Sequence, residues 1–270
     1  MKKMIFAALI VTSMIFSSCA NKVATQVKSS DNAATKPEVK VQEKPKVEQV
    51  ATTDEKTPAK ASIKTIVIDP GHASHANLNK EANAPGSNVM KIKDGGGATG
   101  ITTHTSEYAI NMKVAMKLKN LLENQGYKVI MTKSENSVSL GNIERAEIGN
   151  SANAALVIRI HADSSTSSSV NGASLLVPAK INSNTNAIGD ISLTYGKVIL
   201  NTLTKAVGMK NNGVVSRSDM TGFNWSKVPV VLVEMGFLSN DNEDKLLSSD
   251  SYQNKIASAL AIGIKNAMPN

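Results

Sequence analysis

The sequence predicts a single α/β domain over residues 63–270, built on a twisted, mostly parallel or mixed sheet with helices on both faces. Two observations lead to this fold class. Short runs of aliphatic residues alternate along the chain with longer segments whose apolar residues recur at helical spacing. Glycine, proline and polar residues separate these segments, as is typical of connecting turns. Strands separated by helices favour a sheet that is covered on both sides.

The expected strands are short runs rich in Val, Ile and Leu. The run IKTIVI opens the domain, ALVIRI lies near its middle, and VPVVLV follows later in the chain. Runs of this length and composition are typical of strands buried on both faces. The expected strands span residues 63–68, 128–132, 155–160, 173–177 and 228–233.

The expected helices lie between and after these strands. In the first of them, Ile110, Val114 and Leu118 recur at helical spacing, and Gly126 ends the helix. A long amphipathic segment and a closing segment near the C-terminus have the same kind of spacing. The expected helices span residues 107–125, 140–150, 188–207 and 252–267.

The first nineteen residues have the composition of an export signal. Two lysines precede an apolar run from Met4 to Phe16, and small residues follow. A membrane span is the competing interpretation, but a helix of this run rises only about 20 Å, short of the ~30 Å hydrocarbon core. We therefore expect a signal peptide over residues 1–19.

Cys19 is the only cysteine of the chain, and with Phe16, Ser17 and Ser18 it resembles a bacterial lipobox. In that pattern the cysteine carries lipid and becomes the mature N-terminus, which implies an extracytoplasmic protein anchored to the cell membrane. Ordinary cleavage near Ala20, with secretion to the cell wall, is the alternative. Either outcome leaves the folded domain without disulfides or thiol chemistry.

Residues 20–62 are rich in Lys, Glu, Thr, Val, Pro and Ala and contain no aromatic residue. Such a segment buries too little apolar surface to offset its ordering entropy, so we expect a disordered tether. The chain as a whole has a formal charge of +8, but the domain itself holds twenty Lys and Arg against sixteen Asp and Glu. This mild excess, without a basic stripe interleaved with aromatic residues, argues against nucleic acid as a partner.

Three expected strands end at a residue that can bind a metal or transfer a proton. His72 follows the first strand, His161 follows ALVIRI, and Glu234 follows VPVVLV. The carboxyl ends of strands are where sites assemble in open α/β sheets. Glu107 opens the helix 107–125. Two imidazoles and one carboxylate form a common catalytic zinc set with an open fourth position, and a further Glu can serve as general base.

The residues around these positions resemble the zinc-dependent N-acetylmuramoyl-L-alanine amidases. The similarity runs from about residue 63 to about residue 268, and its motifs occur in the family's order. The motifs are IVIDPGH at 66–72, SEYAIN at 106–111, GYKV at 126–129, RIHAD at 159–163 and PVVLVEMGFLSN at 229–240.

The resemblance implies that His72, Glu107 and His161 bind Zn²⁺ and that Glu234 is the catalytic carboxylate. It also implies a hydrolase whose partner is peptidoglycan, and which cuts the amide bond between N-acetylmuramic acid and the L-alanine of the stem peptide. We expect the protein to be a monomer. A zinc peptidase of the stem and a non-catalytic wall-binding lipoprotein are the alternatives. The presence of all four residues argues against a vestigial site.

Each histidine and acid also has a structural interpretation. His72 can cap a turn after Pro-Gly, and Glu234 can be a buried structural acid, although a buried carboxylate without a partner is costly. His75 and His104 match no family position. We expect both to be solvated loop residues.

Arg159 lies two residues before His161 in the same expected strand, so both side chains should point to one face. It is a candidate to contact substrate carboxylates or the developing oxyanion. The alternative is an ion pair with Glu144 or another acid, and we favour this structural role slightly.

The segment between His72 and Glu107 is longer than is usual for the family. It contains five glycines and shows no helical or strand period. We expect residues 73–106 to form a mobile flap that hangs over the edge of the metal site and serves as a wall of the substrate groove. A tolerated insertion that faces solvent is the alternative.

Replacing Cys19 with Ala tests the lipid anchor. If Cys19 carries lipid, Cys19→Ala releases the protein from the membrane fraction or blocks its maturation. One acyl chain binds a bilayer only marginally, so stable retention of the wild type requires the two or three chains of bacterial lipoproteins. Fractionation and immunoblotting measure the outcome, and an unchanged membrane fraction contradicts lipidation.

Overall fold

The computed structural model describes residues 63–269. The expected signal peptide, Cys19 and the expected tether lie outside the described residues. Within the described part, no helix combines the length and the apolar character needed to cross a membrane.

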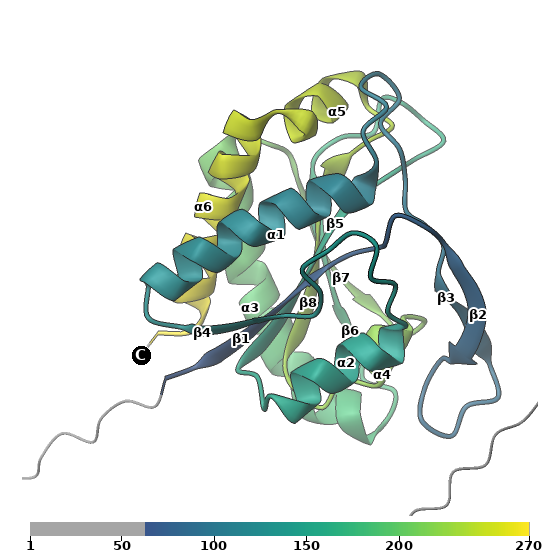
Figure 1. Ribbon diagram of the computed structural model, residues 1–270. Coiled ribbons are helices and arrows are strands. Elements are labelled where there is room, and N and C mark those ends of the chain that lie inside the picture. The colour runs from purple at the N-terminus through teal and green to yellow at the C-terminus, as the bar shows by residue number, and fades with distance from the viewer. Residues whose placement is uncertain (1–62, 270) are drawn as a thin grey trace, which may run out of the picture. The chain divides into compact units, whose positions relative to one another are not determined.

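The predicted fold class is confirmed. The domain is built on a six-stranded mixed sheet with the strand order β4-β1-β5-β8-β6-β7 (Figure 1). Strands β4, β1, β5 and β8 run parallel to one another, β6 runs antiparallel to β8, and β7 is parallel to β6. The strands span β1 Thr65–Pro70, β4 Lys128–Met131, β5 Leu156–Asp163, β6 Ala173–Pro178, β7 Asn211–Arg217 and β8 Val230–Phe237.

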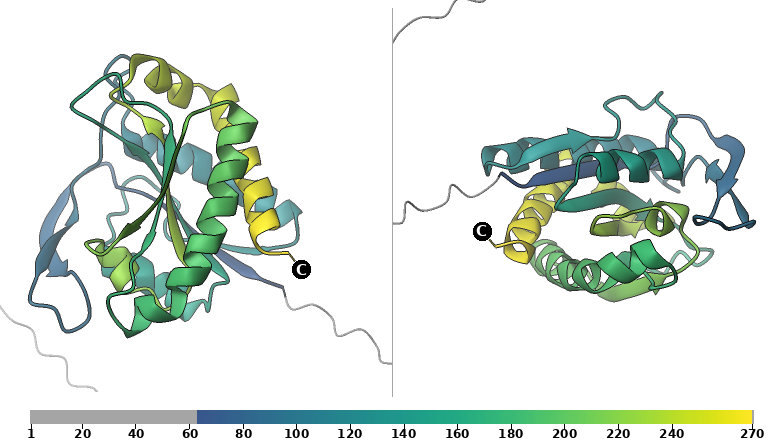
Figure 2. Two further views of the ribbon diagram at one scale, coloured as in Figure 1. Left: turned by 180° about the vertical axis from the view of Figure 1, so that it is seen from behind. Right: turned by 90° about the horizontal axis from the view of Figure 1, so that it is seen from below.

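Helices cover both faces of this sheet. Helices α1, α3 and α6 pack on one face, where α3 and α6 lie side by side, and α2 and α4 pack on the other (Figures 1 and 2). The short helix α5 joins the end of β8 to α6. The helices span α1 Glu107–Asn124, α2 Asn142–Ser151, α3 Ser183–Val207, α4 Thr221–Asn224, α5 Asp241–Ser248 and α6 Asp250–Ala267.

Side-chain alternation along the central strands creates two cores. In β5, Ile158 and Ile160 join the large core under α1, α3 and α6, whereas Val157 joins the smaller core on the α2 and α4 side. The next two residues on that second side are Arg159 and His161, because successive side chains of a strand point to opposite faces. This face of the sheet is therefore apolar at the start of the strands and polar at their carboxyl ends.

The expectation that residues 73–106 contain no strands is wrong. Strands β2 (Asn77–Ala82) and β3 (Met90–Asp94) form an antiparallel hairpin that stands apart from the main sheet at the edge of the domain (Figure 1). Its strands are mostly exposed and polar, so no buried period marks them in the sequence. Strand β7 and the short helices α4 and α5 were also not predicted.

Long-range hydrogen bonds attach the hairpin to the domain. The buried carboxylate of Glu81 accepts from the backbone N–H of Asn142 at 2.7 Å and of Ile143 at 3.2 Å, at the start of α2. The indole N–H of Trp225, the only tryptophan of the chain, donates to the Ala82 carbonyl at 2.9 Å. The hairpin is thus fixed to α2 and to the residue after α4, contacts that no local pattern predicts.

The carboxylate of Asp69 is fully buried at the end of β1 and binds two arginines. Arg145 of α2 donates to Asp69 Oδ1 at 2.5 Å, and Arg159 of β5 donates to Asp69 Oδ2 at 2.8 Å. The Thr132 hydroxyl, just after β4, donates to Oδ1 at 2.6 Å. Burial alone raises the pKa of Asp69, but the two guanidinium groups outweigh it and hold the pKa well below its usual range. The charged carboxylate therefore joins four elements of the fold.

Replacing Asp69 with Asn is expected to destabilise the domain strongly. Removing the negative partner leaves two buried guanidinium groups uncompensated, which costs about 3–5 kcal/mol of the free energy of unfolding. Urea unfolding of the variant measures the loss. Asp190→Asn, which breaks the exposed Lys180–Asp190 pair, is the control and is expected to cost less than about 1 kcal/mol. Equal stability of Asp69→Asn and the wild type would show that the ion pairs of Asp69 with Arg145 and Arg159 do not contribute to the free energy of unfolding.

Candidate active site

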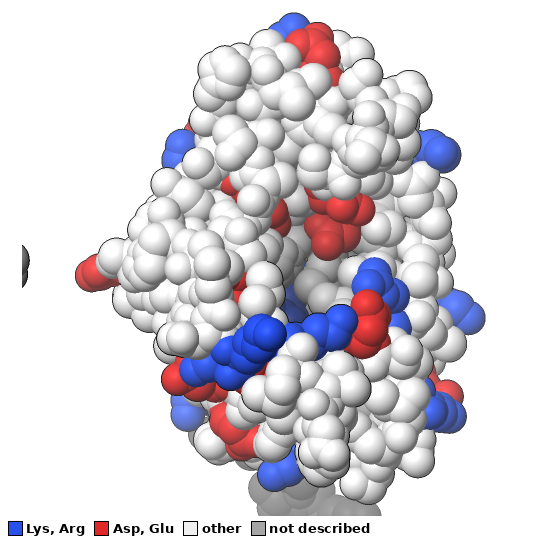
Figure 3. All heavy atoms as spheres, turned by 90° about the vertical axis from the view of Figure 1, so that its right-hand side faces the viewer, with Lys and Arg blue, Asp and Glu red and all other residues white. Residues whose placement is uncertain are grey.

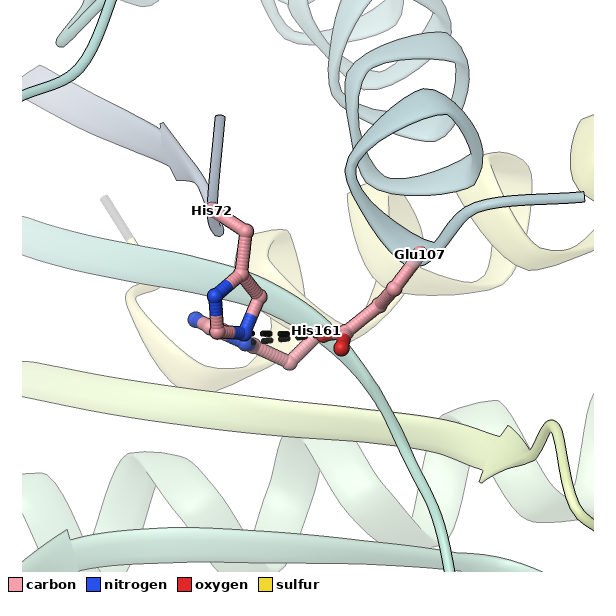
Figure 4. Close-up of side chains that lie close together, drawn as sticks. All are labelled: His72, Glu107 and His161. Atoms are coloured by element: carbon pink, nitrogen blue, oxygen red, sulfur yellow. Dashed lines mark hydrogen bonds and ion pairs between the residues drawn. The ribbon is translucent and has the colours of Figure 1, made fainter. Parts of the chain in front are cut away.

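Three predicted ligands, separated by up to 89 positions in the sequence, meet at one point of the structure. His72, Glu107 and His161 each offer one ligand atom, and these atoms all lie within 4.8 Å of one another. Glu107 Oε1 lies 3.1 Å from His161 Nδ1 and 3.4 Å from His72 Nε2 (Figure 4). The two imidazole rings are edge to face, with centroids 4.9 Å apart. Both rings thus share one carboxylate oxygen.

His72 follows β1 in the left-handed region of backbone conformation, with φ 60°. A non-glycine residue rarely adopts this conformation, which costs of order 1–3 kcal/mol and is concentrated at functional sites. Its ring is held from behind by Asp94, whose Oδ1 lies 2.6 Å from His72 Nδ1. Because Nδ1 is occupied by Asp94, Nε2 is the nitrogen that faces Glu107.

Glu107 is the first residue of α1 and is buried. Its Oε2 accepts from the backbone N–H of Ala98 at 2.8 Å. Its Oε1 accepts from the Asn111 side chain, one turn along α1, at 3.1 Å and from the Ala162 N–H at 3.2 Å. These bonds fix the carboxylate so that Oε1 points between the two imidazoles.

Two glycines leave the space that the ligand side chains occupy. A Cβ on Gly71 would lie 2.2 Å from the His161 ring. A Cβ on Gly97, whose φ is 76°, would lie 2.9 Å from both Glu107 Oε2 and the His72 ring. Real Cβ atoms do not approach other atoms this closely, so both positions require glycine for the site to close.

The pKa values of His72, His161 and Glu107 are shifted in different directions by their surroundings. Burial alone lowers the pKa of His72, but hydrogen bonds with Asp94 and Glu107 outweigh it and raise the pKa to about 9. Burial lowers the pKa of His161 to about 4. Burial raises the pKa of Glu107, but its hydrogen bonds with His161 and His72 reverse this and leave the pKa well below its usual range. Glu107 is therefore charged at neutral pH and ready to bind a cation.

Glu234 lies beside this cluster on β8, in register with His161 on β5. Its side chain is half-buried, and Oε2 is shielded from solvent with no hydrogen-bond partner among residues 63–269. Burial raises the pKa of Glu234 well above its usual value, and the charges of Glu107 and Asp163 act in the same direction. Glu234 is thus a carboxyl group that a proton or a nearby cation would stabilise.

These residues fit a zinc ion. Two imidazole nitrogens and one carboxylate oxygen are the usual donors of a catalytic zinc site that keeps an open position. Asp94 supplies the carboxylate that commonly orients a ligating histidine from behind. The ring atom Nε2 of His161 is also buried without a hydrogen-bond partner in the described part of the chain. A dication would compensate the charges of Glu107 and Glu234, which lie close together.

The remaining residues singled out from the sequence lie elsewhere. His75 and His104 are exposed and take no part in the cluster. Arg159 is buried on the same face as His161, and the acid that it pairs with is Asp69, while its Nη2 donates to the Asn142 side chain at 2.9 Å. Glu144 pairs instead with Lys93, at 4.0 Å.

Asp94 was not identified from the sequence as part of the site. It stands immediately before three consecutive glycines, so the sequence marks a turn there but gives no sign of a contact with a histidine 22 positions earlier. The contact depends on the hairpin, because β3 ends at Asp94. Only the fold brings this carboxylate to His72.

The cluster lies where an open cleft meets a cavity of about 290 Å³. His72, His161 and Glu234 line both. Figure 3 shows this face of the molecule, with acidic side chains around the hollow centre and a band of Lys and Arg beneath it. The other residues that line the cavity are Ile92, Lys93, Asp94, Gly95, Asn142, Arg145, Arg159, Met220 and Leu232.

Replacing Asp94 with Ala is expected to weaken zinc binding about 10- to 100-fold, because residues that orient a ligand from behind typically contribute that much. Titration of the metal-free protein with zinc against a competing chelator measures the affinity. Asp219→Ala is the control, since Asp219 pairs with Arg217 and does not contact the cluster. Unchanged affinity in Asp94→Ala would show that His72 needs no such support.

A known protein family and its members match most of the domain. The sequence profile of a family described as N-acetylmuramoyl-L-alanine amidase matches residues 66–266. The chain is 27% identical over 237 residues to the amidase AmiC of Neisseria meningitidis, covering 74% of this chain and 51% of that protein. It therefore spans about half the length of that relative.

Two further proteins match over most of their length. An N-acetylmuramoyl-L-alanine amidase of Mycobacterium tuberculosis is 25% identical over 219 residues, covering 77% of this chain and 88% of that protein. The crystal structure of the apo form of the N-acetylmuramyl-L-alanine amidase Ami1 from Mycobacterium abscessus superposes with a TM-score of 0.69 at 25% identity. That match covers 76% of this chain and 98% of the other.

Proposed function

The chain belongs to the N-acetylmuramoyl-L-alanine amidase family, and from this premise we propose that its domain is a zinc-dependent peptidoglycan hydrolase that cleaves the amide bond between N-acetylmuramic acid and L-alanine of the stem peptide. The observation that carries the proposal is the convergence of His72, Glu107 and His161 beside Glu234 in an open cleft. Zinc-assisted amide hydrolysis uses such a set of three donors with a further carboxylate beside it as general base.

His72, Glu107 and His161 would hold the ion. Bound there, zinc supplies Lewis-acid activation of a water and of the scissile carbonyl. Glu107 is kept charged by its hydrogen bonds, and Asp94 keeps Nε2 of His72 directed into the site. The protein's part in binding is therefore to present three donors that need no rearrangement.

Glu234 acts as the general base. Its carboxylate accepts a proton from the attacking water and then passes that proton to the leaving nitrogen of L-alanine. Burial raises the pKa of the Glu234 carboxyl group, which makes its carboxylate a stronger base toward the attacking water.

The extracytoplasmic location, the lipid on Cys19 and the monomeric state belong to the same proposal. Peptidoglycan lies outside the cytoplasmic membrane, and the export pattern of residues 1–19 supports delivery to it. A lipid on Cys19 and the segment 20–62 would keep the domain within reach of the wall.

Mass analysis of digested peptidoglycan tests the activity. The zinc-loaded wild type is expected to release free stem peptides that begin with L-alanine, and a chelator is expected to abolish the release. Glu234→Gln is expected to retain zinc but lose about 10²–10⁴-fold in turnover, since a general base contributes this much. His161→Ala is the matched variant, in which zinc content itself should fall.

The outcomes separate the alternatives. Shortened stems still attached to the glycan would identify a peptidase, and intact muropeptides would identify a wall-binding protein. Near-normal turnover of Glu234→Gln would assign the proton transfer to another group. Full zinc occupancy in His161→Ala would contradict the ligand set.

A further inference from the structure

The cavity beside the proposed metal ligands is lined by three cationic side chains and by two acids, Asp94 and Glu234. Lys93 of β3, Arg145 of α2 and Arg159 of β5 line it, and they come from three separate elements. The Lys93 ammonium group is only loosely paired, with Glu144 Oε2 4.0 Å away, and its side chain is 28% exposed. Lys93 is thus free to bind a group that enters the cavity.

The two arginines carry more charge than their partner neutralises. Arg145 and Arg159 are 4% and 5% exposed, and both pair with the single carboxylate of Asp69. Two guanidinium groups on one carboxylate leave this group of three residues with a net positive charge of one, which the carboxylate of Asp94, also lining the cavity, offsets in part. The atom Nη2 of Arg145 is buried and has no hydrogen-bond partner among the described residues. A buried excess charge of this kind is stabilised by an anion in the adjacent space.

The open cleft on the other side of the ligands has the opposite character. It is lined by Glu107, Asp163 and Glu234, together with small residues, and no Lys or Arg lines it among the described residues. A carboxylate that enters the cavity therefore meets one Lys and two Arg side chains, whereas the cleft offers it none as a lining partner. The two spaces meet at His72, His161 and Glu234, where the scissile bond would lie.

We propose that the cavity between β3 and the sheet is a carboxylate subsite that binds the stem peptide on the leaving-amine side, with Lys93 and the Arg145–Asp69–Arg159 group as its positive charges. This inference rests on the proposed function. The glycan, which presents hydroxyl and N-acetyl groups, then occupies the open cleft. The anionic stem peptide and the uncharged part of the glycan therefore bind on opposite sides of the scissile bond.

The carboxylate nearest to the scissile bond on the peptide side belongs to the second stem residue, D-glutamate, which directly follows L-alanine. When this residue is amidated to D-isoglutamine, the negative charge is lost while the size of the group is nearly unchanged. The subsite therefore predicts a preference for stems with D-glutamate at this position. A hydrogen bond to a charged group corresponds to about a ten- to hundredfold difference in affinity.

Binding of two product peptides tests the subsite without any turnover. L-alanyl-D-glutamyl-L-lysine and L-alanyl-D-isoglutaminyl-L-lysine, joined through the γ-carboxyl group of the second residue, lack the scissile bond. Isothermal titration into the zinc-loaded wild type is expected to give about tenfold tighter binding of the carboxylate form. The corresponding muramyl peptides are expected to show the same preference in KM, with a similar kcat.

Lys93→Gln and Lys91→Gln form a matched pair of variants. Both remove one charge from β3, but Lys91 does not line the cavity. Lys93→Gln is expected to reduce the preference for the carboxylate about fivefold or more, whereas Lys91→Gln leaves it near the wild-type value. Since both positions are partly or fully exposed, neither change is expected to affect folding, which thermal unfolding verifies.

Equal binding of the two product peptides to the wild type would overturn the subsite. Equal loss of preference in Lys91→Gln and Lys93→Gln would also overturn it. The effect would then come from the overall positive charge of this surface and not from a contact with Lys93. A carboxylate preference in binding without hydrolysis of any muramyl peptide would support the subsite and contradict the proposed amidase activity.

Discussion

The buried carboxylate of Asp69 is the interaction on which the site depends. It lies three residues before His72, and its partner Arg159 lies two residues before His161. A charge removed from water is tolerated only when both of its oxygens are well paired, so Asp69 constrains the ends of β1 and β5, the residue after β4 and helix α2 to one arrangement. Two of the three proposed metal ligands, His72 and His161, lie at or just after these constrained strand ends. Their geometry is therefore set by the fold before any ion binds.

The pleat of the sheet explains why the sequence reveals so much of the site. On the α2 and α4 side, Val67 is followed by Asp69, Val157 by Arg159 and Leu232 by Glu234, each two positions along its strand. The same runs that predict buried strands thus also indicate where each strand becomes polar. Because three of these strands are parallel neighbours, their polar ends meet at one edge. The fold class, the central strands and the positions of His72, His161 and Glu234 were predictable for this reason.

The features that were missed depend on contacts between distant residues. Strand β7 is a half-exposed edge strand that includes Gly213 with φ 90°, so neither its composition nor its burial marks it. The hairpin buries few of its own side chains and is fixed by Glu81 and by Trp225. The partner of Arg159 also depends on long-range pairing, because β1 and β5 are neighbours whose register places Asp69 opposite Arg159, whereas Glu144 pairs with Lys93.

Strand β3 connects the proposed carboxylate subsite to the proposed metal site. Lys93 lines the cavity, and the next residue, Asp94, holds His72 at 2.6 Å. Lys93 and Asp94 are adjacent and both line the cavity, so one short segment serves both purposes. A shift of β3 large enough to open the cavity would also withdraw Asp94 from His72 and loosen a ligand. The bonds of Glu81 and Trp225, which hold the hairpin against α2 and the end of α4, therefore stabilise the ligand geometry as well as the wall of the cavity.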